Sequence, residues 1–383
     1  MKVHCCHLCK GQLFRRPLVK LRGMPRAAQY FPCKDEFQAD KGRDLSVYQC
    51  SSCGLVQLDA PPVKYFKEVI TATAFSQKTK DVRRKSMKEF VRRFQLEGKK
   101  VLEVGTGKGE MLDILSEVGL RATGIEASIA SATAGRSLGR NIVTGYIGNT
   151  RRLPGSPFSA FVSFNYLEHL PNPGHILRRI YENTTADAVG FVTVPNLEYL
   201  LSSKCFYEFV FDHLSYFTSK TLSYAFESSG FEVLECHTIN QGNDIAAIVK
   251  KRQAVSFQEH FSDVKRLTQD LRRIVNSYRA QNKKIAIWGA GHRTLALLAL
   301  SKIKGISYIV DSAKFKQGRF TPVLHIPIVA PECLTQQTVD LVIVMVPGLY
   351  PEEVVRSLKQ MNIAADVALL RDNTITFMRK KRS

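Results

Sequence analysis

The sequence lacks the long apolar runs and low-complexity tracts that mark membrane-spanning or disordered proteins. No stretch approaches the roughly 18–20 apolar residues that a membrane span needs, and residues 1–6 do not form the hydrophobic core of a signal peptide. Since 44% of the 383 residues are hydrophobic and 23% are charged, the composition is that of a globular protein of two or three domains. We therefore expect a soluble, cytoplasmic chain without a membrane partner.

Acidic residues are scarce, with 34 against 55 Lys and Arg and a formal net charge of +21. A surplus of this size first suggests a nucleic-acid partner. However, residues 101–252 contain 13 basic and 15 acidic residues, so the surplus lies on the flanks of the stretch that carries the motifs described below. This distribution argues against nucleic acid, and scattered positive charge also suits a small anionic substrate such as a sugar nucleotide.

We expect no disulfide framework, because the chain has nine cysteines, an odd number, and its first residues do not resemble an export signal. Four of them form two short pairs, Cys6–Cys9 and Cys50–Cys53. Two intervening residues let both thiolates of a turn face one ion, and two such turns complete a tetrahedral structural zinc site. Cys5 or His4 can replace Cys6 as a ligand. The sequence therefore predicts a zinc-binding module over residues 1–62.

Segment 101–110 follows this module and has the pattern of a strand, a GxGxG turn and the start of a helix. Glycines there let the backbone approach a ligand closely. Glu103 stands just before the turn, and Glu126 ends the next strand 23 residues later. An acid at this second strand end can accept both ribose hydroxyls of a nucleoside.

The ExGxGxG form resembles that of the class I S-adenosylmethionine methyltransferases, and segment 161–173 resembles their fourth strand and the loop after it. The resemblance implies a doubly wound α/β core over residues 63–252 that binds S-adenosylmethionine. The residues that we expect to bind this cofactor are Glu103, Gly105, Thr106, Gly107, Gly109, Glu126, Ala127 and Asn165.

Residues 253–383 are predicted to begin with an amphipathic helix over 257–280 and to continue as a second Rossmann-like α/β domain. Segment 288–294 starts like a dinucleotide fingerprint but has Thr294 where the third glycine belongs. A helix that begins after Gly291, with Lys316 or His325, can receive a pyrophosphate.

The order of the three parts resembles that of the zinc-binding C-methyltransferases that act on nucleotide-linked 4-keto-deoxy sugars. Four segments carry the likeness: 50–58, the first glycine turn, 212–218, and 316–318 with 322–328. The resemblance implies a structural zinc ion and a nucleotide-sugar substrate held in part by the last domain. The candidate substrate-binding residues there are Gly289, Gly291, His292, Lys316 and His325.

Methyl transfer to carbon needs a carbanion equivalent, and a ketone beside the target carbon makes its proton removable by a base. His213 with the neighbouring Asp212 is the first candidate for this base, and His169 is the second. One of these groups, or Tyr216, can donate a hydrogen bond to the developing enolate oxygen. Each of these side chains can equally be a packed structural residue.

The chain reads Val210-Phe211-Asp212-His213 where the sugar enzymes tend to read Tyr-His-Glu-His. This departure leaves open a non-enzymatic protein that binds a sugar nucleotide or cofactor. The basic flanks leave open an RNA or protein methyltransferase. Binding that falls steeply with added salt would favour a polymer substrate.

Overall fold

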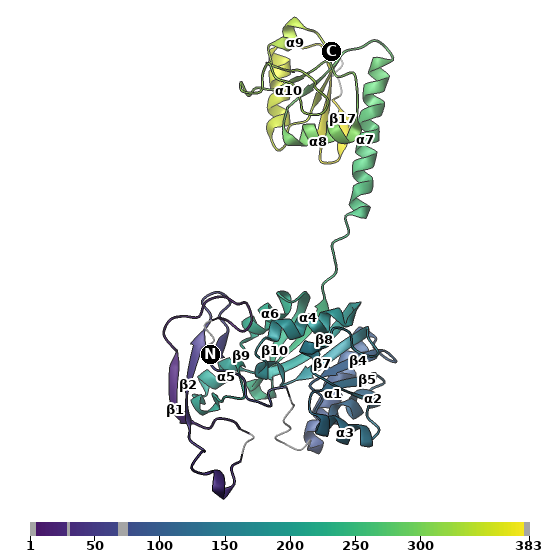
Figure 1. The fold of residues 1–383 in the computed structure, drawn as a ribbon. Helices are drawn as coiled ribbons and strands as arrows, with labels where there is room; N and C mark the ends of the chain where they lie inside the picture. Colours follow the sequence, from purple (N-terminus) through teal and green to yellow (C-terminus); the bar gives the residue numbers. More distant parts are fainter. Residues whose placement is uncertain (1–4, 29–30, 68–75, 379–383) are drawn as a thin grey trace. The chain divides into compact units, whose positions relative to one another are not determined.

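The computed structural model describes residues 5–28, 31–67 and 76–378, in two compact units that comprise residues 1–254 and 255–383 (Figure 1). Among these described residues, no helix is both long and apolar enough to cross a membrane. Each unit has its own hydrophobic core, and each is described below by itself.

The N-terminal part of the first unit is a four-stranded antiparallel sheet in the order β1-β2-β3-β9. Its strands are β1 (Val19–Met24), β2 (Arg43–Gln49), β3 (Val56–Leu58) and β9 (Ser215–Tyr216). Because Val56 pairs with Tyr216, this sheet joins the N-terminal segment to a distant part of the same unit. Its apolar face packs on the helix α5 (Leu197–Ser202) through Leu197 and Leu200.

The centre of the first unit is a seven-stranded sheet in the order β10-β11-β8-β7-β4-β5-β6. The strands are β4 (Lys100–Val104), β5 (Arg121–Glu126), β6 (Ile142–Thr144), β7 (Phe158–Phe164), β8 (Thr184–Pro195), β10 (Phe231–Ile239) and β11 (Asp244–Lys251). The first five of these run parallel, and β10 and β11 pair antiparallel at one edge. Helices cover both faces, so β4 and β7 are buried along most of their length.

One face of this sheet is covered by α1 (Gln77–Phe94), α2 (Glu110–Glu117) and α3 (Ile129–Ser137), and the other by α4 (Pro173–Glu182) and α6 (Ser219–Glu227) (Figure 1). Ser76 caps α1 by accepting a hydrogen bond from the Thr79 N–H. Asn172 caps α4, and Pro173 fits its first turn. Short 3₁₀ turns lie at η1 (Lys34–Glu36), η2 (Ile147–Asn149), η3 (Leu167–His169), η4 (Phe206–Glu208) and η5 (Asn240–Gly242).

The second unit is a six-stranded sheet in the order β14-β13-β12-β15-β16-β17, parallel except for the last pair. Its strands are β12 (Ile285–Trp288), β13 (Tyr308–Val310), β14 (Ile328–Val329), β15 (Leu341–Val344), β16 (Asp366–Arg371) and β17 (Thr374–Phe377). Its helices are α7 (Gln258–Arg279), α8 (His292–Ser301), α9 (Cys333–Gln336) and α10 (Tyr350–Gln360). The predicted fold class, a doubly wound α/β core with an N-terminal cysteine module and a second Rossmann-like domain, is thereby confirmed.

Candidate active site and metal centre

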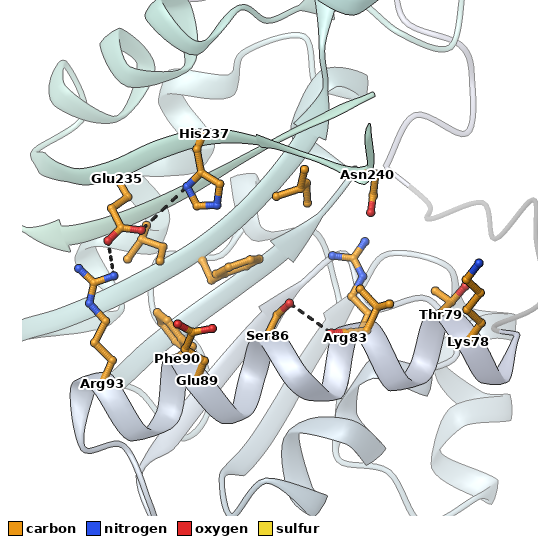
Figure 2. Close-up of a pocket in the computed structure, with 14 residues that line it drawn as sticks. Lys78, Thr79, Arg83, Ser86, Glu89, Phe90, Arg93, Glu235, His237 and Asn240 are labelled. Atoms are coloured by element: carbon orange, nitrogen blue, oxygen red, sulfur yellow. Dashed lines mark hydrogen bonds and ion pairs between the residues drawn. The ribbon is translucent and has the colours of Figure 1, made fainter. Parts of the chain in front are cut away.

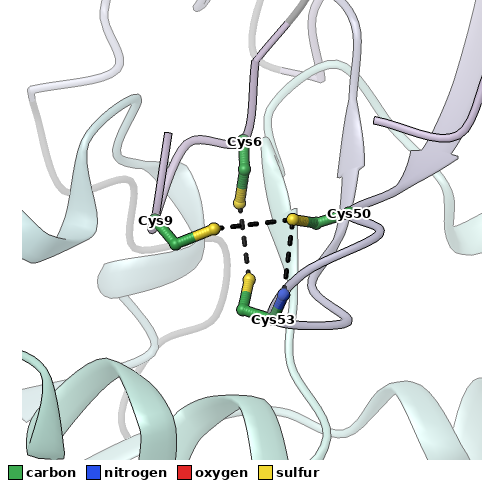
Figure 3. Close-up of side chains that lie close together, drawn as sticks. All are labelled: Cys6, Cys9, Cys50 and Cys53. Atoms are coloured by element: carbon green, nitrogen blue, oxygen red, sulfur yellow. Dashed lines mark hydrogen bonds between the residues drawn. The ribbon is translucent and has the colours of Figure 1, made fainter. Parts of the chain in front are cut away.

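Four cysteines converge at the edge of the N-terminal sheet (Figure 3). The sulfur atoms of Cys6, Cys9, Cys50 and Cys53 all lie within 4.8 Å of one another. The Cys6–Cys53 and Cys9–Cys50 sulfur separations are each 3.5 Å, close to the roughly 3.8 Å edge of a tetrahedron of thiolates at 2.3 Å from zinc. Cys5 is exposed and lies outside this group, and His4 lies outside the described residues.

The backbone around the four sulfurs is shaped to stabilise thiolates. The sulfurs of Cys6 and Cys50 accept hydrogen bonds from the N–H groups two residues later, at Leu8 and Ser52, both at 3.4 Å. Burial raises the pKa of Cys50, but the hydrogen bonds from the Cys53 and Ser52 N–H groups outweigh it and lower this pKa to about 7, whereas burial raises the pKa of Cys6 to about 11 and also raises that of Cys53. Four thiolates in this arrangement can hold a zinc ion and leave no open position on it.

The first glycine turn lies between β4 and α2, where Gly105, Gly107 and Gly109 all have positive φ. At Gly105 (φ 74°), a Cβ atom would lie 2.6 Å from the Tyr166 ring, so no other residue fits there. Glu126, at the end of β5, accepts hydrogen bonds of 2.8 Å from the N–H groups of Gly107 and Ser128. Ala127 follows it and is partly buried.

Glu103 lies beneath this turn and is fully buried by its neighbours. The Thr106 hydroxyl donates a hydrogen bond to its carboxylate. Burial raises the pKa of Glu103 to about 8. A bound cation beside this group would favour its ionised form.

Asn165 directly follows β7, has φ of 47° and contacts two other strands, β8 and β11. Its amide nitrogen donates to Asp244 at 3.0 Å, and its carbonyl oxygen accepts from the Thr193 hydroxyl at 2.7 Å. The backbone of Asn165 is therefore held firmly at the carboxyl edge of the parallel strands, where doubly wound sheets bind ligands.

The candidate catalytic histidines meet beside this edge. The rings of His169, in η3, and His213, just before β9, are edge to face with their centroids 4.7 Å apart. Nδ1 of His169 lies 2.8 Å from the Asp212 carbonyl oxygen. Burial and the neighbouring His169 lower the pKa of His213 to about 3, and burial also lowers the pKa of His169. Burial therefore favours the neutral form of both imidazoles.

Asp212 and Tyr216 make contacts other than those expected of a carboxylate that assists the His213 base and of a hydroxyl that binds the enolate oxygen. The Asp212 carboxylate accepts hydrogen bonds from the Tyr65 hydroxyl at 2.7 Å and from the Ala28 N–H at 2.8 Å. The Tyr216 hydroxyl accepts from the Val210 N–H at 2.9 Å and is buried. Asp212 therefore reaches His169 through its carbonyl group, and Tyr216 fixes the turn before β9.

The departure from the sugar-enzyme pattern has a structural explanation at Phe211. This side chain is only 3% exposed and packs with Leu200 and Phe209 beneath the N-terminal sheet. The guanidinium of Arg43 lies over its ring, 5.1 Å from the centroid. An aromatic residue here fills a core position and leaves His213 in place beside His169.

A groove with a volume of about 800 Å³ runs between α1 and the β10–β11 edge of the sheet (Figure 2). Arg83 and Asn240 face one another at one end, and Arg93 pairs with Glu235 at the other. The Arg83 guanidinium lies 4.3 Å from the Phe164 ring centroid, and burial lowers its pKa despite the nearby acids Asp244 and Glu103. Sequence reasoning missed Arg83, because one basic residue in a basic helix carries no signal.

Of the candidate substrate residues of the second unit, Gly289, Gly291 and His292 form its own glycine turn and helix start, and Lys316 is linked to this turn through Asp311. Gly289 has φ of 108° and Gly291 precedes α8, whose first residue is His292. Lys316 forms an ion pair of 2.9 Å with Asp311, and Asp311 also accepts from the Ala290 N–H at 2.8 Å. His325 is exposed and has φ of 52°.

Comparison with known proteins agrees with this arrangement. Residues 79–236 match the family model of the methyltransferase domain. The first unit therefore contains the core of a methyltransferase that uses S-adenosylmethionine. Residues 242–366 match the model of the C-methyltransferase C-terminal domain, so the chain combines a methyltransferase domain with a C-methyltransferase C-terminal domain.

A relative, the C-methyltransferase NovU of Streptomyces niveus, is 26% identical over 289 residues, which cover 67% of this chain and 68% of that protein. Solved structures similar to the chain include an S-adenosylmethionine-dependent methyltransferase from Clostridium acetobutylicum, with 10% identity, a TM-score of 0.39, and coverage of 49% of this chain and 96% of that one. Another is the plantazolicin methyltransferase BpumL in complex with SAH, with 14% identity, a TM-score of 0.39, and coverage of 47% and 87%. TM-scores of this size support no inference about function.

Proposed function

We propose that this protein methylates a carbon atom next to the ketone of a nucleotide-linked 4-keto-deoxy sugar. The observation that carries the proposal is the edge-to-face meeting of the His169 and His213 rings, whose centroids lie 4.7 Å apart, close to the end of β7. The match to the C-methyltransferase C-terminal domain supports carbon as the acceptor. The similarity to NovU supports the same reaction class.

The first glycine turn fits S-adenosylmethionine. The glycines at 105, 107 and 109 let the cofactor approach the backbone, and Glu126 is placed to accept its ribose hydroxyls. S-adenosylmethionine supplies an electrophilic methyl group on a sulfonium. Glu103 and Asn165 complete the set of cofactor residues that we propose, with Thr106 and Ala127 beside them.

His213 acts as the base in this proposal. Among the described residues, no hydrogen bond to its ring is found, so a ring nitrogen is available to take the proton from the carbon beside the ketone. His169, oriented by the Asp212 carbonyl group, lies against His213 and can hydrogen-bond to the enolate oxygen. The enolate carbon then forms the new bond to the methyl group as the sulfur–methyl bond breaks.

Two further parts have supporting roles. The four cysteines hold a structural zinc ion, which fixes the N-terminal segment. Two groups of this segment, the Ala28 N–H and the Tyr65 hydroxyl, donate hydrogen bonds to Asp212. In this proposal the second unit binds the nucleotide of the substrate near Gly289, Gly291, His292, Lys316 and His325, where Lys316 supplies a positive charge beside the glycine turn.

The test is methyl transfer from labelled S-adenosylmethionine to a panel of nucleotide-linked 4-keto-6-deoxy sugars. His213→Asn should bind the cofactor normally and lose at least about 100-fold in turnover, the usual contribution of a general base. His237→Asn, in the groove and away from the paired rings, is the matched control. Unchanged turnover in His213→Asn would remove this residue from the mechanism, and no transfer to any sugar would contradict the proposed substrate class.

A further inference from the structure

Three metal-ligating side chains gather beside β7, apart from the cysteine cluster. A carboxylate oxygen of Glu168 and ring nitrogens of His169 and His213 all lie within 4.8 Å of one another. Glu168 and His169 belong to η3, and His213 precedes β9. The turn that carries His213 is held to η3 by the hydrogen bond from the Leu214 N–H to the Glu168 carbonyl oxygen, at 2.8 Å.

The hydrogen bond of His169 determines which nitrogen can bind a metal ion. A carbonyl oxygen only accepts, so Nδ1 of His169 carries the proton that it shares with Asp212 at 2.8 Å. Nε2 therefore presents its lone pair, and it lies 3.8 Å from Oε1 of Glu168. Two atoms at this separation can both lie about 2.0–2.2 Å from one ion between them.

Glu168 and His213 also have lone pairs that accept no hydrogen bond from a described residue. Glu168 is only 2% exposed, and its Oε2 atom has no hydrogen-bond partner among the described residues. A buried carboxylate oxygen without a partner needs an explanation, and an absent ion is one. His213 packs its ring against His169 without a hydrogen bond to any described residue.

We propose that Glu168, His169 and His213 form a second metal site, for a divalent transition-metal ion such as Zn²⁺ or Co²⁺. Two imidazoles and one carboxylate suit these ions, and three protein ligands leave a position open to an exchangeable oxygen ligand. The Asp212 carbonyl group is the outer partner that orients His169.

The ion at this site inhibits methyl transfer. It takes the lone pair of His213 that the proposed base needs, so metal binding and proton removal exclude one another. This consequence rests on the proposed function, whereas the metal site itself does not.

The experiment uses the full chain with the cysteine cluster filled by one equivalent of zinc and then titrated with Co²⁺. Cobalt binds nitrogen, oxygen and sulfur sites less tightly than zinc, so it leaves the cysteine cluster occupied. We expect one Co²⁺ ion per chain, with weak visible bands and without the intense near-ultraviolet band of cobalt–thiolate bonds. Glu168→Gln and His213→Asn should each weaken Co²⁺ binding by at least about 100-fold, with unchanged circular dichroism.

His237→Asn, which removes an imidazole outside the group, should keep the full affinity. Failure of the zinc-loaded chain to take up Co²⁺, a thiolate band, or unchanged affinity in His213→Asn would overturn the second metal site. Turnover that stays the same at saturating Co²⁺ would overturn the inhibition. If the chain methylates no sugar at all, the proposed function fails, but the Co²⁺ titration still decides the metal site.

Discussion

The two units carry the same strand–glycine turn–helix element but complete it differently. In the first unit, Glu126 accepts from the N–H groups of Gly107 and Ser128, both at 2.8 Å. In the second, Asp311 accepts from Ala290 and Ala313 at 2.8 and 2.9 Å, and it also pairs with Lys316 at 2.9 Å. The second turn thus has its acidic group neutralised by a lysine five residues later.

The glycines differ as well. Although Gly105 and Gly289 both have positive φ and a Cβ atom on either would lie 2.6 Å from a neighbouring side chain, the next glycines differ: Gly107 has φ of 57°, whereas Gly291 has φ of −88° and open space where its Cβ atom would be. The comparison teaches that a glycine turn followed by an acid does not define a nucleoside site. The packing of the glycines and the charge beside the acid decide what the turn can bind.

The two units should differ most in how their stability responds to loss of the proposed zinc ion. We expect Cys50→Ser with Cys53→Ser to abolish the tightly held zinc and to unfold much of the first unit, because structural zinc contributes about 10–16 kcal/mol in small zinc modules. The second unit should keep its protection against hydrogen exchange. Mass spectrometry after mild chelation measures zinc and amide protection together, and a normal zinc content would contradict the ligand assignment.

Substitutions of Glu126 and Asp311 should affect cofactor binding differently. Glu126→Gln should weaken S-adenosylmethionine binding about 10- to 100-fold, as expected for the loss of charged hydrogen bonds. Asp311→Asn should leave the Kd unchanged, because its turn belongs to the other unit. Isothermal titration calorimetry measures both, and equal losses in the two variants would remove the distinction.

The two glycines provide a smaller, purely structural test. Gly105→Ala should destabilise the first unit by roughly 1–3 kcal/mol, from its backbone conformation and the clash with Tyr166. Gly291→Ala has room for the added methyl group and should change the free energy of unfolding very little. Urea unfolding of the two variants gives the values. A large loss in Gly291→Ala would show that the second turn is also tightly packed.

Glu103 and Asp311 should also give opposite pH dependences of stability. Burial raises the pKa of Glu103 from 4.5 to about 8, so the folded state keeps a proton that the unfolded state has released, and stability falls as pH rises between these values. Burial also acts to raise the pKa of Asp311, but the Lys316 ion pair and two N–H groups lower it overall below 3.8. Its contribution is therefore present above that pH and lost on acidification.

Unfolding curves at several pH values check both signs. Glu103→Gln should lose less stability than the parent between pH 5 and 8. Asp311→Asn should be less stable than the parent at neutral pH and nearly equal to it in acid. If the difference in stability between variant and parent changed with pH in the same direction for both variants, the assigned causes of the pKa shifts would be contradicted.

Short-range features were predictable from the sequence because they depend on local spacing. Two residues between cysteines sufficed to predict the Cys6–Cys9 and Cys50–Cys53 cluster. The GxGxG turn and the acid at position 126 followed from strand and turn signals alone. The helix expected over 257–280 is α7 (Gln258–Arg279), which follows its amphipathic pattern.

Long-range contacts were not predictable, because no local pattern encodes them. The Tyr65 hydroxyl reaches Asp212 across 147 positions, and β3 pairs with β9 between Val56 and Tyr216. In the first cysteine turn, Lys10 rather than Gly11 has positive φ, which the residue types alone do not indicate. Gly11 is needed for a different reason: a Cβ atom there would lie 2.7 Å from the Ser52 hydroxyl oxygen.

The measurement that tests the central claim most directly is the position of the transferred methyl group. S-adenosylmethionine labelled with ¹³C in its methyl group would be incubated with the chain and a nucleotide-linked 4-keto-6-deoxy sugar, and the product examined by ¹³C NMR. We predict a methyl signal of the carbon-bound type, present with the parent chain and absent with His213→Asn. A methyl signal of the oxygen-bound type, or an undiminished signal in that variant, would contradict carbon methylation with His213 as the base.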